Sequence, residues 1–185
     1  MADELIIKNG SIVEGSIAAI DGTTQALPTS TGTISPGVTS APISSRIPEF
    51  GFTGDVLASQ TAGATLAVGQ VCYLRTNGKW FTANSAQVAT GDGMLGIALN
   101  AASLNGGVDI FTRGIIGTNI DILTSVGSGT GQPIYLATTA GTMTQTAPSS
   151  ENNIVRILGH YLNLVSGQTE KYVISFNPDS IWLEL

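Results

Sequence analysis

The chain has 185 residues and a net charge of −6, and only 11% of its residues are charged, against about 25% in an average globular protein. The seven lysines and arginines are scattered singly, so no basic patch is expected, and this excludes nucleic acid as the main partner. No stretch approaches the run of about 18 apolar residues that a membrane-spanning helix needs, which excludes such a helix.

Residues 1–20 predict a short hairpin that needs a partner surface. The segment begins with acidic side chains where a signal peptide needs basic ones, so we expect the protein to be made and folded in a cytoplasm. Two short apolar stretches flank Asn9-Gly10, a dipeptide typical of a tight hairpin turn. A hairpin of this size is too small to be stable alone, so it is predicted to anchor the chain. Its candidate contact residues are Leu5, Ile6, Ile7, Ile12 and Val13.

Residues 21–54 predict an extended arm rather than a packed domain. The segment is rich in Thr, Ser, Pro and Gly, and it carries no charge between Asp21 and Arg46. Its four evenly spaced prolines block ladder hydrogen bonds and favour an extended backbone. Near its end, Phe50 and Phe52 are predicted to contact another protein surface.

The remainder of the chain predicts an all-β fold. The longest run without Gly or Pro lies between Gly78 and Gly91, which leaves room for at most about three helical turns. Asn77-Gly78 and Asn105-Gly106 fall between apolar runs, as hairpin turns do.

An internal repeat predicts how these strands are organised. Residues 69–78 align with 131–141, residues 95–100 align with 158–163, and a strand-like run follows each copy, at 108–111 and 171–176. We therefore predict that residues 55–185 form a duplicated β-domain, with repeats of about 55–120 and 121–185. Two such units close most simply into a small β-barrel or β-sandwich in which each half covers the apolar face of the other.

The residue types that carry chemistry do not form a recognisable site in the sequence. His160 is the sole histidine, and it aligns with the apolar Ile97, which favours a half-buried structural role over a catalytic base. Cys72 aligns with Ile134, which favours a small core residue over a nucleophile. The carboxylates are too widely spread to indicate an acid pair or a calcium loop. We predict no catalytic residue, no metal site and no cofactor, and thus a protein that is not an enzyme.

The aromatic residues allow two interpretations. Trp80 and Phe81 follow a predicted turn; an exposed tryptophan stacks on sugars, whereas a buried one belongs to the core, and the sequence leaves both readings open. Trp182 lies in the strand-like run 180–185, which we expect to dock onto the domain.

Several segments resemble the capsid decoration, or cement, proteins of tailed bacteriophages. The similarity covers about residues 54–163 and depends on residues 54–56, LAVGQV at 66–71, GIAL at 96–99, residues 108–114 and GQPIYL at 131–136. Residues 142–148, 176–179 and 182–185 are similar to the ends of phage virion proteins, and residues 5–16 are similar to a segment of phage fibre and appendage proteins. A minimal cement protein lacks the long N-terminal extension, which favours a fibre or an anchored appendage.

The resemblance implies a virion structural protein on the capsid surface, which decorates or stabilises the shell. Its implied partners are the major capsid protein and other copies of itself, often as a homotrimer, with no nucleic-acid or membrane partner. For the trimer interface we predict the apolar residues Ile181, Trp182, Leu183 and Leu185. The alternative is a head-fibre or host-adhesion module that binds carbohydrate through Trp80 and Phe81.

Overall fold

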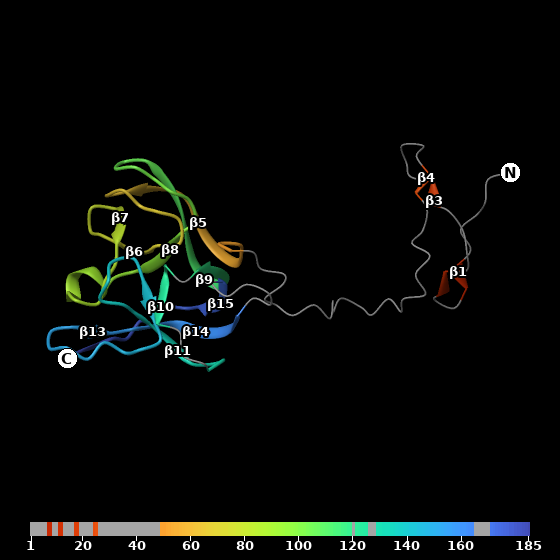
Figure 1. The fold of residues 1–185 in the computed structure, drawn as a ribbon. Coiled ribbons are helices and arrows are strands. Elements are labelled where there is room, and N and C mark those ends of the chain that lie inside the picture. The colour runs from red at the N-terminus through yellow and green to blue at the C-terminus, as the bar shows by residue number, and fades with distance from the viewer. Residues whose placement is uncertain are drawn as a thin grey trace. The chain divides into compact units, whose positions relative to one another are not determined.

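A computed structural model of the chain describes residues 49–119, 121–125, 129–164 and 171–185, together with four two-residue strands nearer the N-terminus (Figure 1). Contacts within the chain divide it into two units, Met1–Ser40 and Ala41–Leu185. The boundary between the units, after Ser40, thus lies between the predicted domain boundaries at residues 20 and 54.

The N-terminal unit contains two antiparallel strand pairs. Strand β1 (Ile7–Lys8) pairs with β2 (Ser11–Ile12), which confirms the predicted hairpin around Asn9-Gly10. Strand β3 (Ile17–Ala18) pairs with β4 (Thr24–Gln25), so the predicted boundary after residue 20 falls inside a strand pair. The predicted contact residues Leu5, Ile6 and Val13 lie outside the described residues, as does the predicted arm from residue 26 to residue 48.

The second unit is built from strands, which confirms the predicted all-β fold. Its described residues hold one short 3-10 turn, η1 (Val88–Thr90), and no helix among them is long and apolar enough to cross a bilayer. The first strand begins before the predicted start of the domain at residue 55. The strands are β5 (Phe52–Ala62), β6 (Val71–Leu74), β7 (Lys79–Thr82), β8 (Leu95–Ala98), β9 (Gly107–Asn119), β10 (Leu123–Ser125), β11 (Pro133–Leu136), β12 (Met143–Thr144), β13 (Ile154–Val155), β14 (Ile157–Leu164), β15 (Lys171–Phe176) and β16 (Leu183–Glu184).

The first five of these strands close into a ring. The long strand β9 pairs with β5 on one side and with β8 on the other, and β6 and β7 complete the circuit in the order β9, β5, β7, β6, β8, β9. The β5–β7 pair is parallel and the other pairs are antiparallel. The ring is therefore a small barrel, one of the two architectures that the repeat predicts.

The second repeat reproduces these pairings. Strand β10, which follows β9 along the chain, pairs in parallel with β12; β12, β11, β14 and β15 then continue in antiparallel pairs back to β9. Equivalent residues also pair in the same way: Cys72 lies opposite Gly96, and Ile134 lies opposite Gly159. The predicted internal repeat is thus confirmed in the strand order and in the register, and β9 belongs to both copies.

Two glycines allow β5 and β9 to approach closely where β9 passes between the repeats. Gly54 and Gly114 lie opposite each other, with φ of +151° and +134°, values that side chains rarely adopt. A Cβ atom on Gly54 would lie 2.0 Å from the carbonyl oxygen of Arg113, and one on Gly114 would lie 2.1 Å from that of Thr53. Both positions therefore require glycine.

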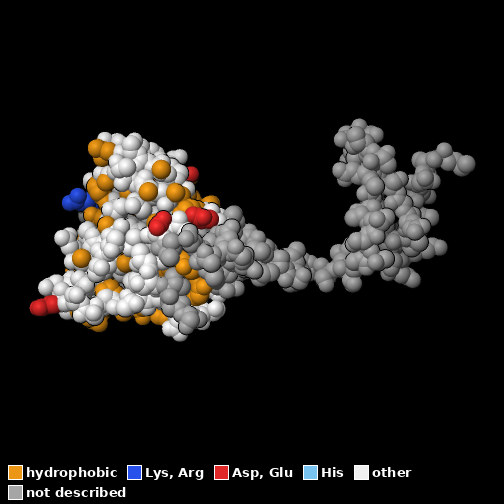
Figure 2. Space-filling model, in the orientation of Figure 1, with side chains coloured by type: hydrophobic (Ala, Val, Ile, Leu, Met, Phe, Trp, Pro, Cys, Tyr) orange, Lys and Arg blue, Asp and Glu red, His pale blue; other side chains and the backbone are white. Residues whose placement is uncertain are grey.

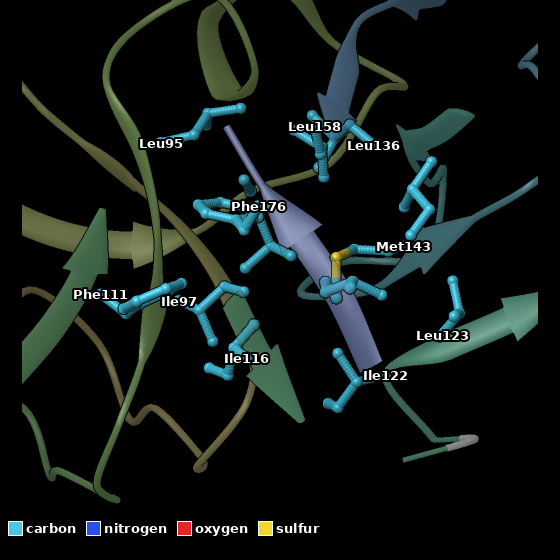
Figure 3. Close-up of a cluster of buried hydrophobic side chains, with 14 of the residues drawn as sticks. Leu95, Ile97, Phe111, Ile116, Ile122, Leu123, Leu136, Met143, Leu158 and Phe176 are labelled. Carbon is cyan, nitrogen blue, oxygen red and sulfur yellow. The ribbon is translucent and has the colours of Figure 1, made fainter. Parts of the chain in front are cut away.

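The buried apolar residues form two clusters. Because successive side chains of a strand point to opposite faces, residues next to each other in one strand can belong to different clusters. In β6, Cys72 belongs to the smaller cluster of the first repeat, whereas Val71 and Tyr73 belong to the larger one. The larger cluster joins both repeats, and in Figure 3 its side chains gather around one central strand. It includes Leu95 and Ile97 of β8, Phe111 and Ile116 of the shared strand β9, and Leu136, Met143, Leu158 and Phe176 of the second repeat.

Backbone hydrogen bonds reinforce the contact between the repeats. The Val71 amide donates to the Gly141 carbonyl at 2.9 Å, and the Gly141 amide donates to the Ala83 carbonyl at 2.8 Å. Ser85 accepts from the Ile154 amide at 2.8 Å and donates its own amide to the Ala137 carbonyl at 2.9 Å. These bonds satisfy backbone groups that the packing would otherwise leave unpaired.

Replacing Gly114 with alanine tests the close approach of β5 and β9. We expect Gly114→Ala to lower the free energy of unfolding by about 2–3 kcal/mol, because the new Cβ meets backbone atoms at a strained φ. The matched control is Gly107→Ala at the start of the same strand, where no atom lies within 4 Å of the added Cβ. Urea unfolding measures both, and equal stability of the two variants would contradict this account.

Candidate functional site

The structure gives Cys72 and His160 no shared reactive role. Cys72 is fully buried, and this burial raises the pKa of its thiol to about 12, so the thiol stays protonated at neutral pH. His160 is exposed on β14, opposite Pro133, so the prediction of a half-buried histidine is wrong. Its repeat mate Ile97 is buried because the second repeat covers that face of the first, whereas the equivalent face at His160 is open.

The described carboxylates do not converge on one point. Among described residues the single ion pair joins Arg113 and Asp55 at 3.3 Å, and both side chains are about two-thirds exposed (68% and 66%). Asp109 instead accepts a hydrogen bond from the Ser59 amide at 2.8 Å, which fixes an irregular point of β5. In the part of the chain that the structure describes, no three His, Cys, Asp or Glu side chains gather as a metal site would require.

Arg156 forms a buried polar contact that the sequence analysis missed. Its Nε donates to the Asp179 carbonyl at 2.9 Å, and one terminal nitrogen donates to the carbonyls of Gly91 and Gly93 at 2.5 and 2.6 Å. Burial lowers the pKa of this guanidinium, while the charges of Asp92 and Asp179 act in the opposite direction. An arginine stays protonated under such a shift, so Arg156 is a charged link between a loop of the first repeat and the second repeat.

Trp80 belongs to the core, which corrects the prediction of a carbohydrate contact there. None of its surface is exposed, and its indole Nε1 donates to Gln60 at 3.4 Å. A buried indole has no face on which a sugar can stack. Phe81 is half-buried against the larger cluster, and the guanidinium of Arg75 lies 5.4 Å from the centre of its ring.

A groove of about 310 Å³ lies near β10 and β12. Its described lining is rich in hydroxyl groups and holds no charged or aromatic side chain. Two of these hydroxyls already serve the fold, because Thr124 donates to the Met143 carbonyl at 3.2 Å and Thr144 accepts from the Thr146 amide at 3.1 Å. The groove can hold a neutral polar molecule but offers no group that would activate one.

The predicted protein-contact residues at the end of the arm and near the C-terminus divide into packed and exposed sets. Phe50 and Trp182 are half-buried against the larger cluster, so they mainly hold their segments onto the domain. Ile181, Leu183 and Leu185 are 81%, 60% and 41% exposed, on alternate positions of a segment whose strand β16 pairs with β13. The predicted docking of this run is confirmed, and three apolar side chains face outward from it.

The remaining predicted contacts lie on β1, β2 and β5. Ile7 and Ile12 are direct partners in the β1–β2 pair. Phe52 is 42% exposed, with its ring 5.5 Å from that of Phe111.

Further exposed apolar residues had no signal in the sequence. They are Leu57, Val68, Met94 and Leu104. Single exposed apolar residues are common on protein surfaces, so neither periodicity nor spacing distinguishes them from core residues. Figure 2 shows that charged side chains are sparse among the described atoms of the face drawn, where polar and apolar groups make up most of the surface.

Comparison with known proteins does not identify the chain. No protein-family model matches the chain, and no curated protein is significantly similar to it in sequence.

Arg156 is predicted to be a main stabiliser of the contact between the repeats. We expect Arg156→Ala to lower the free energy of unfolding by about 3 kcal/mol or more, because it leaves three carbonyls without a donor. Arg156→Lys recovers only part of this, since one ammonium cannot reproduce the planar fork. The control is Arg113→Ala, which breaks an exposed ion pair and costs less than about 1 kcal/mol. Chemical denaturation distinguishes them, and an Arg156→Ala variant as stable as Arg113→Ala would refute the assignment.

Proposed function

We propose that the chain is a structural component of a virus particle that decorates or stabilises the outside of a tailed-phage capsid. The proposal starts from the sequence resemblance of residues 54–163 to capsid decoration proteins. The observation that carries it furthest is the division of the chain into a β-domain and a separate N-terminal unit with its own strand pairs. Such a chain has one part to attach to a shell and another to present outside it.

The surface of the β-domain supports a role in assembly. Several large apolar side chains are exposed although the domain has a well-filled core, and charges are few. Exposed apolar side chains with few charges around them favour contacts with other proteins. In this proposal the partners are the major capsid protein and other copies of the chain, with a homotrimer as the assembled form.

The residue on which the carbohydrate-binding alternative mainly depends is not accessible. Trp80 is buried, and Phe81 is half-buried beside Arg75. We therefore retain the head-fibre alternative without carbohydrate binding, as another structural protein attached to the capsid.

A truncation tests the proposed attachment. Purified full-length chain is added to phage heads that lack it, in parallel with residues 49–185, and binding is measured by co-sedimentation. We expect the truncated chain to bind at least about 100-fold more weakly, because linked contacts multiply affinity by about 10²–10⁴. A thermal melt of the truncated chain is the control that its β-domain remains folded.

Two results would contradict the proposal. One is equal binding of the truncated and full chains, which would remove the anchoring role of the N-terminal unit. The other is absence of the protein from purified virions of the phage that encodes it, as measured by quantitative mass spectrometry.

A further inference from the structure

One edge of strand β5 is open over its first five residues, Phe52–Val56. Strand β5 pairs with β9 on one edge, and on the other edge it pairs with β7 only at its last two residues. Four of these five residues are exposed, and Val56 is half-buried. Within the described part of the chain, no other strand or loop forms backbone hydrogen bonds with the open edge. We call it the β5 edge, and its residues are Phe52–Val56.

The bonding to β9 shows which backbone groups the β5 edge presents. Gly117 of β9 donates its amide to the Gly51 carbonyl at 2.9 Å, so Gly51 faces β9. Because successive residues of a strand direct their backbone groups to opposite edges, Phe52, Gly54 and Val56 direct their amide and carbonyl groups away from β9. Each of these three residues thus offers one donor and one acceptor to a neighbouring strand.

The second repeat shows what covers the equivalent edge. Strand β5 ends in a parallel pair with β7, and the second half of β9 leads into β10, which forms the matching parallel pair with β12. The second half of β9 pairs with β15 on one edge, as β5 pairs with the first half of β9. Its other edge, at residues 114–116, is covered in antiparallel pairing by Phe52–Gly54 of β5. An edge of this kind therefore accepts an antiparallel strand, and the strand that it accepts is β5.

The β5 edge lacks the features that keep a sheet edge from pairing. Natural edge strands often carry lysine, proline or inward-pointing charges. Strand β5 has neither lysine nor proline, and its one charged side chain, Asp55, forms an exposed ion pair with Arg113 of the same copy. On the opposite face, the ring of Phe52 lies 5.5 Å from that of Phe111, and Val56 packs against the larger cluster. A strand added here would therefore extend both the ladder and the apolar layer.

The β5 edge is complementary to itself in antiparallel orientation. A two-fold axis at Gly54 places this residue opposite its own copy and Phe52 opposite Val56 of the second copy. All three residues with outward backbone groups then form hydrogen-bonded pairs. In the same register Thr53 lies opposite Asp55 of the second copy, so like charges do not lie directly opposite each other. A second copy supplies this matching pattern by symmetry, which is the reason to prefer it over an unrelated strand.

We propose that two copies of the chain join through their β5 edges, in antiparallel register about Gly54. The contact is isologous, because the same residues form both of its sides. The inference rests on the proposed function in one respect, that copies of the chain assemble. A two-fold contact joins copies in pairs, so it is separate from the interface of the proposed homotrimer, and one assembly can contain both contacts.

Cysteine cross-linking of the full-length chain tests the register. Thr53→Cys and Asp55→Cys are prepared separately; both positions are exposed, and the native Cys72 is fully buried. Across the contact these positions form a pair without hydrogen bonds, with Cα atoms about 4.5 Å apart, which a disulfide can bridge. Either preparation alone places its thiols on diagonal positions about 7–8 Å apart, which is too far. Under mild oxidation we expect the mixture to give at least about fivefold more linked dimer than either preparation alone.

Charge at Thr53 tests the same contact without a cross-link. Sedimentation equilibrium of the full-length chain, from about 1 to 100 µM and without phage particles, measures self-association. We expect Thr53→Asp to weaken it by about fivefold and Thr53→Lys to strengthen it by about threefold, because symmetry brings each new charge opposite Asp55 twice. The controls are Thr138→Asp and Thr138→Lys at another exposed threonine, which should stay within about twofold of the unchanged chain. A thermal melt of each variant shows that it remains folded.

Three results would each overturn the inference. They are a chain that stays monomeric up to the highest concentration, a mixture that cross-links no better than its parts, and Thr53 variants that associate as the Thr138 variants do. None of them bears on attachment to the capsid, because that is measured separately by head binding and by virion mass spectrometry. Conversely, a register-specific cross-link in a protein absent from virions would support the contact and refute the capsid role.

Discussion

The packing of one repeat against the other is the interaction on which the rest of this structure depends. Each repeat spans only about 60 residues, a size at which a single core is marginally stable. The larger cluster solves this problem, because Ile97 and Phe111 of the first repeat pack with Leu136 and Phe176 of the second. Strand β9 belongs to both copies, and Arg156 links them through carbonyl groups. The two repeats therefore share one hydrophobic core and form one folding unit.

This shared core determines what remains on the surface. The covered face of the first repeat is apolar, whereas its equivalent in the second repeat carries the exposed His160. The two repeats thus have equivalent faces, and only the face of the first repeat is covered by the rest of the chain. The large apolar side chains that stay exposed lie elsewhere, on β5, on loops of the first repeat and on the C-terminal segment, in a chain that carries few charges.

The sequence was sufficient to predict the repeat, because Cys72 and Ile134 occupy equivalent positions and pair in the same register. It left two readings open at Trp80, and the structure places this residue in the core, as it does Met143, the equivalent residue of the second repeat. Arg156 could not be predicted, since its acceptors are backbone carbonyls of loops distant in the chain, and carbonyls have no sequence signal. The exposed Met94 and Leu104 were missed because only tertiary contacts decide whether a residue beside a turn is covered.

Hydrogen exchange of the native full-length chain tests the central claim, that the two repeats unfold together. The amides of Cys72 and Ile134 are matched probes, because they lie at equivalent positions of β6 and β11. The shared core predicts that both exchange only through global unfolding, with free energies that agree within about 1 kcal/mol. Exchange of the Ile134 amide at a free energy several kcal/mol lower, with Cys72 still protected, would show that the second repeat opens alone and would contradict the account.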